Sequence, residues 1–272
     1  MDATIILTLF RKEINDALKN RWFMLYAVAF TGLALLLSWL LGPRFIRTLR
    51  RLSVGQNIRD VGPQAHQVKA GTPTMGGLLI LFAALGATLL WGNLANVYVW
   101  IVVLVTAAFG AIGFADDYIK VVKKDKRGLA PRIKVVGQIT LGLIVGTVLY
   151  FHPTFAEVKT LTYFPIIEGE VIDYYFFEGW IGEADLGWLI TIPVAVFIVT
   201  AVSNAVNLTD GLDGLTAGVT AFVALGMTAL TYIAGNEILA DYLNEMYLPG
   251  AGELAIFTVA MAAACFGFLW FN

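Results

Sequence analysis

Seven long apolar stretches, separated by short polar segments, dominate the pattern of hydrophobic positions along this chain. They cover residues 22–41, 74–92, 97–115, 135–151, 186–206, 214–235 and 254–271. A helix of about 20 apolar residues crosses a bilayer, so each stretch predicts a membrane-spanning helix. We therefore expect an all-α polytopic membrane protein with seven transmembrane helices. They would form a single integral-membrane domain over residues 1–272.

The segments outside these stretches predict a few further elements. Residues 1–21 have the pattern of a short amphipathic helix at the outer surface. In the segment 152–185, two runs rich in aromatic and β-branched residues, 158–164 and 171–177, flank Glu168-Gly169-Glu170, which predicts a β-hairpin. Pro193 lies inside the fifth predicted helix and is expected to kink it.

The composition agrees with this pattern and excludes several classes of protein. Hydrophobic residues make up 58% of the chain and charged residues 14%, whereas a soluble domain carries about 25% charged residues. Cys265 is the only cysteine and lies inside the last apolar stretch, which excludes a disulfide framework and a cysteine zinc site. His66 and His152 fall in different loops, so no histidine metal cluster is expected.

The distribution of charge predicts how the helices are oriented. The loops after the first and third predicted helices are strongly basic, whereas the segments 152–185 and 236–253 are acidic. Because cytoplasmic loops carry the excess of lysine and arginine, the loops after the first, third and fifth helices should lie in the cytoplasm. The basic residues of the tail 1–21 disagree, but the two internal loops agree with each other and carry more charge.

Polar motifs gather on this predicted cytoplasmic side. Asp116-Asp117 closes the third helix, and Asn204, Asn207, Asp210 and Asp213 recur every three residues as one predicted polar stripe. A carboxylate costs about 2.5–3.5 kcal/mol at the centre of a membrane helix, so a functional gain is expected. Oxygen ligands near phosphate groups suit Mg²⁺. For Asp116-Asp117 alone, an ordinary helix end at the water interface is an equally good explanation.

Two further features on this side fit both a phosphate site and plain structure. The segment Gly71-Thr72-Pro73-Thr74-Met75-Gly76-Gly77 could present backbone N–H groups to a phosphate at a helix N-terminus. Alternatively, Thr72 is the N-cap and Pro73 the first residue of an ordinary helix. Lys69 and Lys134 could each neutralise a phosphate, although interfacial lysines commonly mark orientation alone.

Four segments closely resemble the phospho-N-acetylmuramoyl-pentapeptide transferases, which belong to the polyprenyl-phosphate N-acetylhexosamine-1-phosphate transferases. The segments are KAGTPTMGG (69–77), GFADDYIKVVKKDKRGL (113–129), NAVNLTDGLDGL (204–215) and FGFLWFN (266–272). The resemblance implies a Mg²⁺-dependent, multi-pass enzyme of the bacterial cytoplasmic membrane with its active site on the cytoplasmic face. Such an enzyme transfers phospho-N-acetylmuramoyl-pentapeptide from UDP-MurNAc-pentapeptide to undecaprenyl phosphate and releases UMP. A homodimer is compatible with the resemblance, and no nucleic acid is expected as a partner.

The resemblance also implies roles for individual residues. Asp116 and Asp117 match the acidic pair, with Asp116 as the candidate base for the lipid phosphate and both as candidate Mg²⁺ ligands. Asp210 and Asp213 match acids near the nucleotide and pyrophosphate. The implied substrate-binding residues are Lys69, Thr74, Lys134, Asn204, Asn207 and Asn272. Direct attack and an aspartyl-phosphate intermediate both stay open.

The chain departs from the family at its C-terminal end. Family members have more transmembrane helices than the seven predicted here, and a third acidic motif that supplies the main metal ligand would follow Asn272. We therefore expect the chain to be C-terminally incomplete and inactive on its own. The alternatives are a related transferase that uses another UDP-N-acetylhexosamine and, from a different class, a membrane transporter.

Overall fold

The computed structural model describes residues 21–51, 76–123, 125, 127–163, 171–173, 186–210 and 214–271. Most of these residues form seven long helices. They are α2 (Arg21–Arg51), α4 (Gly77–Trp91), α5 (Val97–Val121), α6 (Pro131–Phe151), α8 (Trp188–Thr209), α9 (Leu215–Ala234) and α11 (Leu254–Leu269). Each corresponds to one predicted span. Within the described ranges, five helical segments are long and apolar enough to cross a membrane, and α2 and α4 contribute shorter apolar ones. The prediction of an all-α polytopic membrane protein is confirmed.

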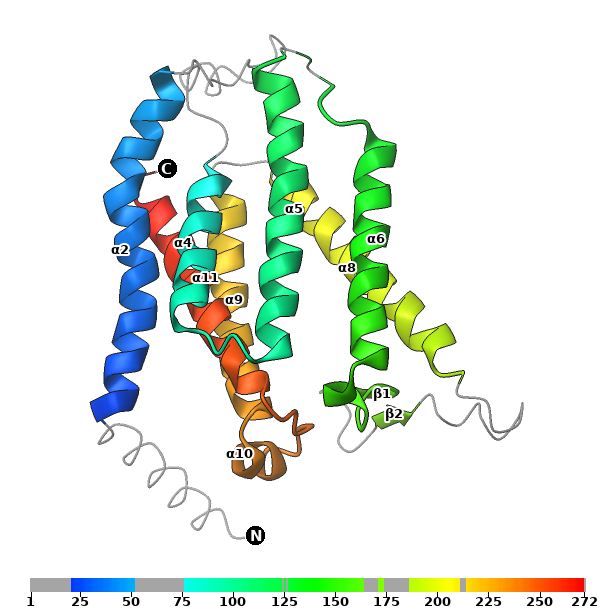
Figure 1. Ribbon diagram of the computed structural model, residues 1–272. Helices are drawn as coiled ribbons and strands as arrows, with labels where there is room; N and C mark the ends of the chain where they lie inside the picture. The colour runs from blue at the N-terminus through cyan, green and yellow to red at the C-terminus, as the bar shows by residue number, and fades with distance from the viewer. Residues whose placement is uncertain are drawn as a thin grey trace.

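The central helix is α11, which packs against α9, α2 and α4 (Figure 1). Small side chains allow this close packing: one buried cluster joins Ala34, Ala87, Ala260 and Ala263 from three helices. At Gly267 of α11, a Cβ would lie 2.5 Å from the Cβ of Ser38 on α2. Because lipid offers no hydrophobic drive between helices, small residues at such contacts provide the van der Waals packing that holds them together.

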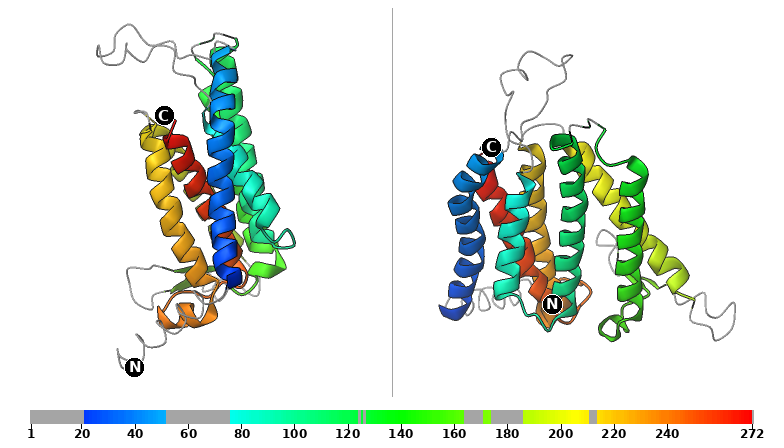
Figure 2. Two further views of the ribbon diagram at one scale, coloured as in Figure 1. Left: turned by 90° about the vertical axis from the view of Figure 1, so that its left-hand side faces the viewer. Right: turned by 45° about the horizontal axis from the view of Figure 1, so that its top comes forward.

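A second unit consists of α6 and α8, which pack extensively against each other beside this bundle (Figure 2). Their contact depends on two glycines of α6 spaced four residues apart. A Cβ at Gly142 would lie 2.7 Å from the Cα of Val196, and one at Gly146 would lie 3.1 Å from the Cα of Ile192. Helix α5 lies between the two units, since it contacts both α4 and α6.

The predicted β-hairpin is confirmed, although it is shorter than expected. Strands β1 (Leu161–Tyr163) and β2 (Val171–Asp173) are antiparallel, with Thr162 opposite Ile172. Three short helices complete the loops at the same end of the molecule: η1 (Pro153–Phe155), α10 (Glu237–Tyr242) and η3 (Ala251–Glu253). The predicted turn residues 168–170 and the predicted N-terminal helix lie outside the described residues, apart from Arg21, which begins α2.

Three predicted boundaries were wrong. Helix α2 continues to Arg51, so Arg44 and Arg47 belong to the helix, where they donate hydrogen bonds to the carbonyls of Leu40 and Pro43, at 3.4 and 3.0 Å. Helix α4 begins at Gly77 with Gly76 at the N-cap, three residues after the start of the predicted span, and Thr72 and Pro73 lie outside the described residues. Helix α8 includes Pro193 and extends to Thr209, three residues beyond the predicted span.

The connectivity brings four helix ends together. The C-terminal ends of α5 and α8 and the N-terminal ends of α6 and α9 point to the same end of the molecule, at the top of Figure 1, opposite the hairpin and α10. This is the end on which the sequence concentrates its polar motifs.

Candidate functional site

Three donors hold the carboxylate of Asp116, which lies in the last turns of α5 and is 7% exposed. Its Oδ2 pairs with Lys120 Nζ at 2.6 Å and with Lys134 Nζ at 2.9 Å. Its Oδ1 accepts a hydrogen bond from the Leu129 N–H at 2.7 Å. Lys120 lies one helical turn after Asp116, whereas Lys134 comes from the first turn of α6. Asp116 therefore joins α5, the following loop and α6.

The loop that reaches back to Asp116 depends on Gly128. This residue has φ +66°, and its N–H donates to the Asp125 carbonyl at 3.1 Å. A Cβ at Gly128 would lie 2.5 Å from Asp116 Oδ1 and 2.6 Å from Lys120 Cε. Because left-handed backbone favours glycine and the space is filled by the carboxylate, this position accommodates no larger residue without displacing Asp116.

A second carboxylate pair lies beside this network. Asp117, half-buried on α5, interacts electrostatically with Asp210 at the end of α8 as well as with Asp116, Lys120 and Lys134. Neither Asp117 nor Asp210 forms an ion pair within 4 Å with another residue that the structure describes. Asp210 is exposed, and its Oδ1 accepts a hydrogen bond from Thr216 Oγ1 at 3.2 Å. The two carboxylates thus form an acidic centre beside the lysine-paired Asp116.

The polar stripe predicted over residues 204–213 is wrong as one helical face. Helix α8 ends at Thr209, and Asp210 at its C-cap has φ −78° and ψ 51°, outside the helical region. Asn204 and Asn207 therefore lie on α8, both exposed, while Asp210 leaves the helix and turns toward α9. Asp213 lies outside the described residues.

Asn204 is held by a residue of α6 that the sequence analysis did not single out. Gln138 Nε2 donates to Asn204 Oδ1 at 3.4 Å, and Asn204 Nδ2 donates to Gln138 Oε1 at 3.1 Å. Gln138 is 8% exposed and lies one turn after Lys134. Helix α6 therefore contacts Asp116 and Asn204 from neighbouring turns.

The chemistry of these donors can be compared with the needs of a divalent cation. The described residues contain no group of three or more histidine, cysteine, aspartate or glutamate side chains that could hold a metal. The oxygens of Asp116 already accept from two lysines and a backbone N–H, whereas Asp117 and Asp210 form no ion pair with any described residue and repel each other electrostatically. Two carboxylates fit Mg²⁺, which takes one or two together with substrate phosphates and water.

The structure tests only part of the predicted site. It brings together Asp116, Asp117, Lys134, Asn204 and Asp210, whereas Lys69, Thr74, Asp213 and Asn272 lie outside the described residues. Lys120, Gly128 and Gln138 also belong to the site, although the sequence motifs did not assign them to it. Lys120 had a signal, because an i,i+4 acid–lysine pair shares one helix face. Gln138 was also recognisable in the sequence, because it is a lone amide side chain in an apolar span.

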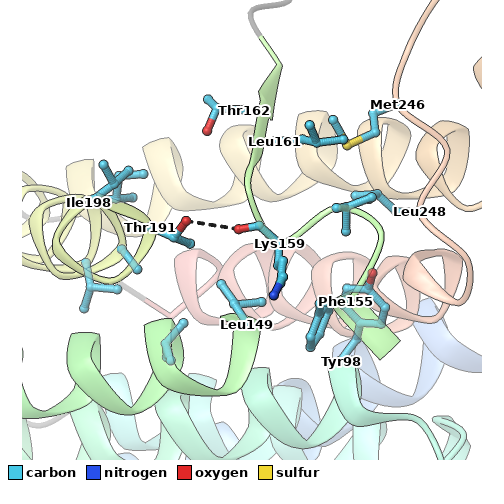
Figure 3. Close-up of a pocket in the computed structure, with 15 residues that line it drawn as sticks. Tyr98, Leu149, Phe155, Lys159, Leu161, Thr162, Thr191, Ile198, Met246 and Leu248 are labelled. Atoms are coloured by element: carbon cyan, nitrogen blue, oxygen red, sulfur yellow. Dashed lines mark hydrogen bonds between the residues drawn. The ribbon is translucent and has the colours of Figure 1, made fainter. Parts of the chain in front are cut away.

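A separate pocket of about 350 Å³ lies at the opposite end of the molecule, between α6, α8 and β1 (Figure 3). Its lining is largely apolar and includes Leu149, Phe155 and Leu248. The polar groups there serve the local fold, since Thr191 Oγ1 donates to the Lys159 carbonyl at 3.0 Å. The pocket is distinct from the site around Asp116.

Comparisons with known proteins identify the family. Residues 99–272 match the model of glycosyl transferase family 4, and residues 69–81 match signature 1 of the phospho-N-acetylmuramoyl-pentapeptide-transferases. These two ranges contain every residue that the sequence analysis assigned to the site, including Lys69 and Thr74 in the signature.

Several relatives carry the name phospho-N-acetylmuramoyl-pentapeptide-transferase. The chain is 56% identical to the protein of Salinibacter ruber over 85% of its own length and 61% of the relative's. It is 43% identical to the protein of Flavobacterium psychrophilum, covering 65% of that relative. It is also 43% identical to the protein of Thermodesulfovibrio yellowstonii, over 96% of the chain and 69% of the relative. The chain belongs to glycosyl transferase family 4 and to the phospho-N-acetylmuramoyl-pentapeptide-transferases.

Proposed function

We propose that this protein transfers phospho-N-acetylmuramoyl-pentapeptide from UDP to undecaprenyl phosphate on the cytoplasmic face of the bacterial membrane. The observation that carries the proposal is the Asp116 network, in which one buried carboxylate is paired with two lysines beside the Asp117–Asp210 pair. Phosphoryl transfer needs mainly positioning and charge neutralisation, and this set of groups supplies both.

Asp116 is the proposed base. It would take the proton of the lipid phosphate, whose oxygen attacks the sugar-linked phosphorus of the UDP substrate. A new P–O–P bond then forms, the bond to UMP breaks, and UMP leaves with the electron pair. Once Asp116 carries the proton, its attraction to Lys120 and Lys134 weakens. Their ammonium groups, 2.6 and 2.9 Å from Asp116 Oδ2, would then be free to contact the phosphates.

Asp117 and Asp210 are the proposed holders of Mg²⁺. When bound, the ion would neutralise pyrophosphate charge and orient its oxygens. This assignment rests on their like charge and on the absence of an ion pair to either carboxylate among the described residues, and it favours Asp117 over Asp116 as a direct ligand. Asn204, Asn207, Lys69, Thr74, Asp213 and Asn272 remain the proposed contacts to substrate, with the first two on α8 at the same end of the molecule.

The test is a transfer assay on the full-length protein reconstituted in nanodiscs. UDP-MurNAc-pentapeptide, undecaprenyl phosphate and Mg²⁺ should yield UMP and a lipid-linked product, and EDTA should abolish both. If UDP-N-acetylglucosamine were the better substrate, the related transferase would be the correct assignment. If the substrate crossed liposome membranes without product formation, a membrane transporter would be the correct assignment.

Two further proposals can be tested with the same preparation. Light scattering of the detergent-solubilised protein tests the proposed homodimer. Cysteine labelling of an exposed position in the loop after α5, such as Lys123→Cys, tests the cytoplasmic orientation in intact cells.

A further inference from the structure

One face of α6 carries residues at intervals of four: Lys134, Gln138, Gly142 and Gly146. The last three are buried. On α8, Ser203 and Asn204 lie opposite Gln138, Val196 lies opposite Gly142, and Ala195 and Ile192 lie opposite Gly146. The face therefore changes in character along the helix. At Gly142 and Gly146 the backbones of α6 and α8 pack closely, whereas the part of the face next to Asp116 carries the buried Gln138 amide and Lys134.

The amide of Asn204 is fixed by hydrogen bonds on both of its atoms. Its Nδ2 donates to Gln138 Oε1 at 3.1 Å and to the Thr200 carbonyl at 2.8 Å, which uses both amide protons. Its Oδ1 accepts from Gln138 Nε2 at 3.4 Å and keeps one further acceptor direction. The same Nε2 also donates to Ser203 Oγ at 3.1 Å, so Gln138 is itself anchored to the residue before Asn204. Because Asn204 is exposed while Gln138 is buried, the free acceptor belongs to a side chain that a ligand can reach.

Close packing of α6 on α8 also occurs away from Gln138. Gly142 and Gly146 already bring the backbones into contact, with would-be Cβ distances of 2.7 Å to the Val196 Cα and 3.1 Å to the Ile192 Cα. A buried amide in a membrane helix is costly unless it is paired. Its placement one turn from Lys134, whose Nζ is 2.9 Å from Asp116 Oδ2, links the orientation of Asn204 to that of Asp116 through one rigid helix.

We infer that Gln138 is a positioning residue, which orients the Asn204 amide so that its oxygen accepts a hydrogen bond from an O–H or N–H group of the nucleotide substrate. The inference rests on the proposed function, because that function supplies the substrate. It also limits the ligand chemistry at Asn204: both amide protons are committed, so Asn204 does not serve as a donor to phosphate.

The test replaces Gln138 with methionine, which has a similar length but no amide. In the transfer assay, Gln138→Met should lower kcat/KM for the UDP substrate about tenfold, mainly by raising KM, as expected for the loss of an oriented hydrogen bond. The matched control is Thr228→Val, which removes a 2.8 Å side-chain hydrogen bond to Thr258 between α9 and α11, two helices outside the α6–α8 unit. This control should keep wild-type KM even if it lowers the melting temperature equally.

A double mutant separates positioning from general stabilisation. If Gln138 acts through Asn204, Asn204→Ala should raise KM similarly, and the double variant should be no worse than Asn204→Ala alone. Additive losses, an unchanged KM in Gln138→Met, or an equal rise of KM in Thr228→Val would overturn the inference. A wild-type protein without transfer activity would instead overturn the proposed function, and this inference with it.

Discussion

Replacing Gly128 with alanine tests whether the loop after α5 holds Asp116 in place. Gly128 has φ +66°, and left-handed backbone costs a residue with a Cβ about 1–2 kcal/mol. The added methyl would also lie 2.5 Å from Asp116 Oδ1, closer than a Cβ approaches any atom. Either the carboxylate moves or the loop does. Both movements remove the 2.7 Å hydrogen bond from the Leu129 N–H.

The expected loss follows from this broken contact. A hydrogen bond to a charged group contributes about 1.5–3 kcal/mol, which corresponds to about a ten- to hundredfold decrease in kcat/KM. The assay is UMP release by purified Gly128→Ala, together with its thermal unfolding. Since the strain acts beside Asp116, the proposed base, activity should fall further than the loss of stability alone explains.

Two controls isolate the cause. Gly113→Ala adds a methyl to the same helix α5 where no atom lies within 4 Å, so activity and stability should be retained. Gly250→Ala introduces the same kind of strain, at φ +85°, but at the opposite end of the molecule, so stability should fall while kcat/KM stays unchanged. Wild-type activity in Gly128→Ala, or an equal loss in Gly250→Ala, would refute the reasoning.

Three further predictions follow from the packing and the acidic pair. Asp117→Asn and Asp210→Asn should each raise the Mg²⁺ concentration that gives half-maximal UMP release, because each removes half of the carboxylate pair; an unchanged Mg²⁺ titration would contradict the assignment. Gly142→Ala should destabilise the protein by about 1–3 kcal/mol, because the added methyl overpacks against the Val196 Cα. Its melting temperature should be lower than that of Gly218→Ala, where no atom lies within 4 Å of the added methyl. Equal melting temperatures would argue against close α6–α8 packing. Thr200→Val should leave stability unchanged or raise it, because the buried Thr200 hydroxyl has no hydrogen-bond partner in the described part of the chain; a marked decrease in melting temperature would show that it has one.

The sequence predicted the helices because each apolar stretch is long enough to span a bilayer. It predicted the ends less well. The sequence predicted that Arg44 and Arg47 lie in a cytoplasmic loop, yet α2 continues through them, and their side chains donate to backbone carbonyls one turn earlier. Asp210 was placed on a helical face by its spacing from Asn207, although the helix ends at Thr209. A three-residue spacing places side chains on one helix face only where the backbone is helical.

The sequence predicted several residues of the site, but not which of them contact each other. Asp116 and Lys134 were both candidates, but their 2.9 Å contact depends on how α5 and α6 pack, which no local pattern encodes. The pairing of Gln138 with Asn204 is likewise a contact between residues 66 positions apart. Gly128 carried no chemical signal at all. Its importance comes from the φ value and from the carboxylate next to it.

The most direct test of the account compares UMP release by Asp116→Asn and Asp125→Asn in the reconstituted protein. Asp125 lies in the same loop region and is exposed, with its Oδ1 accepting only from the Arg127 N–H among the described residues, at 3.0 Å. The account predicts that Asp116→Asn stays folded but loses transfer, and that Asp125→Asn transfers at the wild-type rate. Near-normal UMP release by Asp116→Asn would contradict the central claim that transfer depends on the Asp116 network.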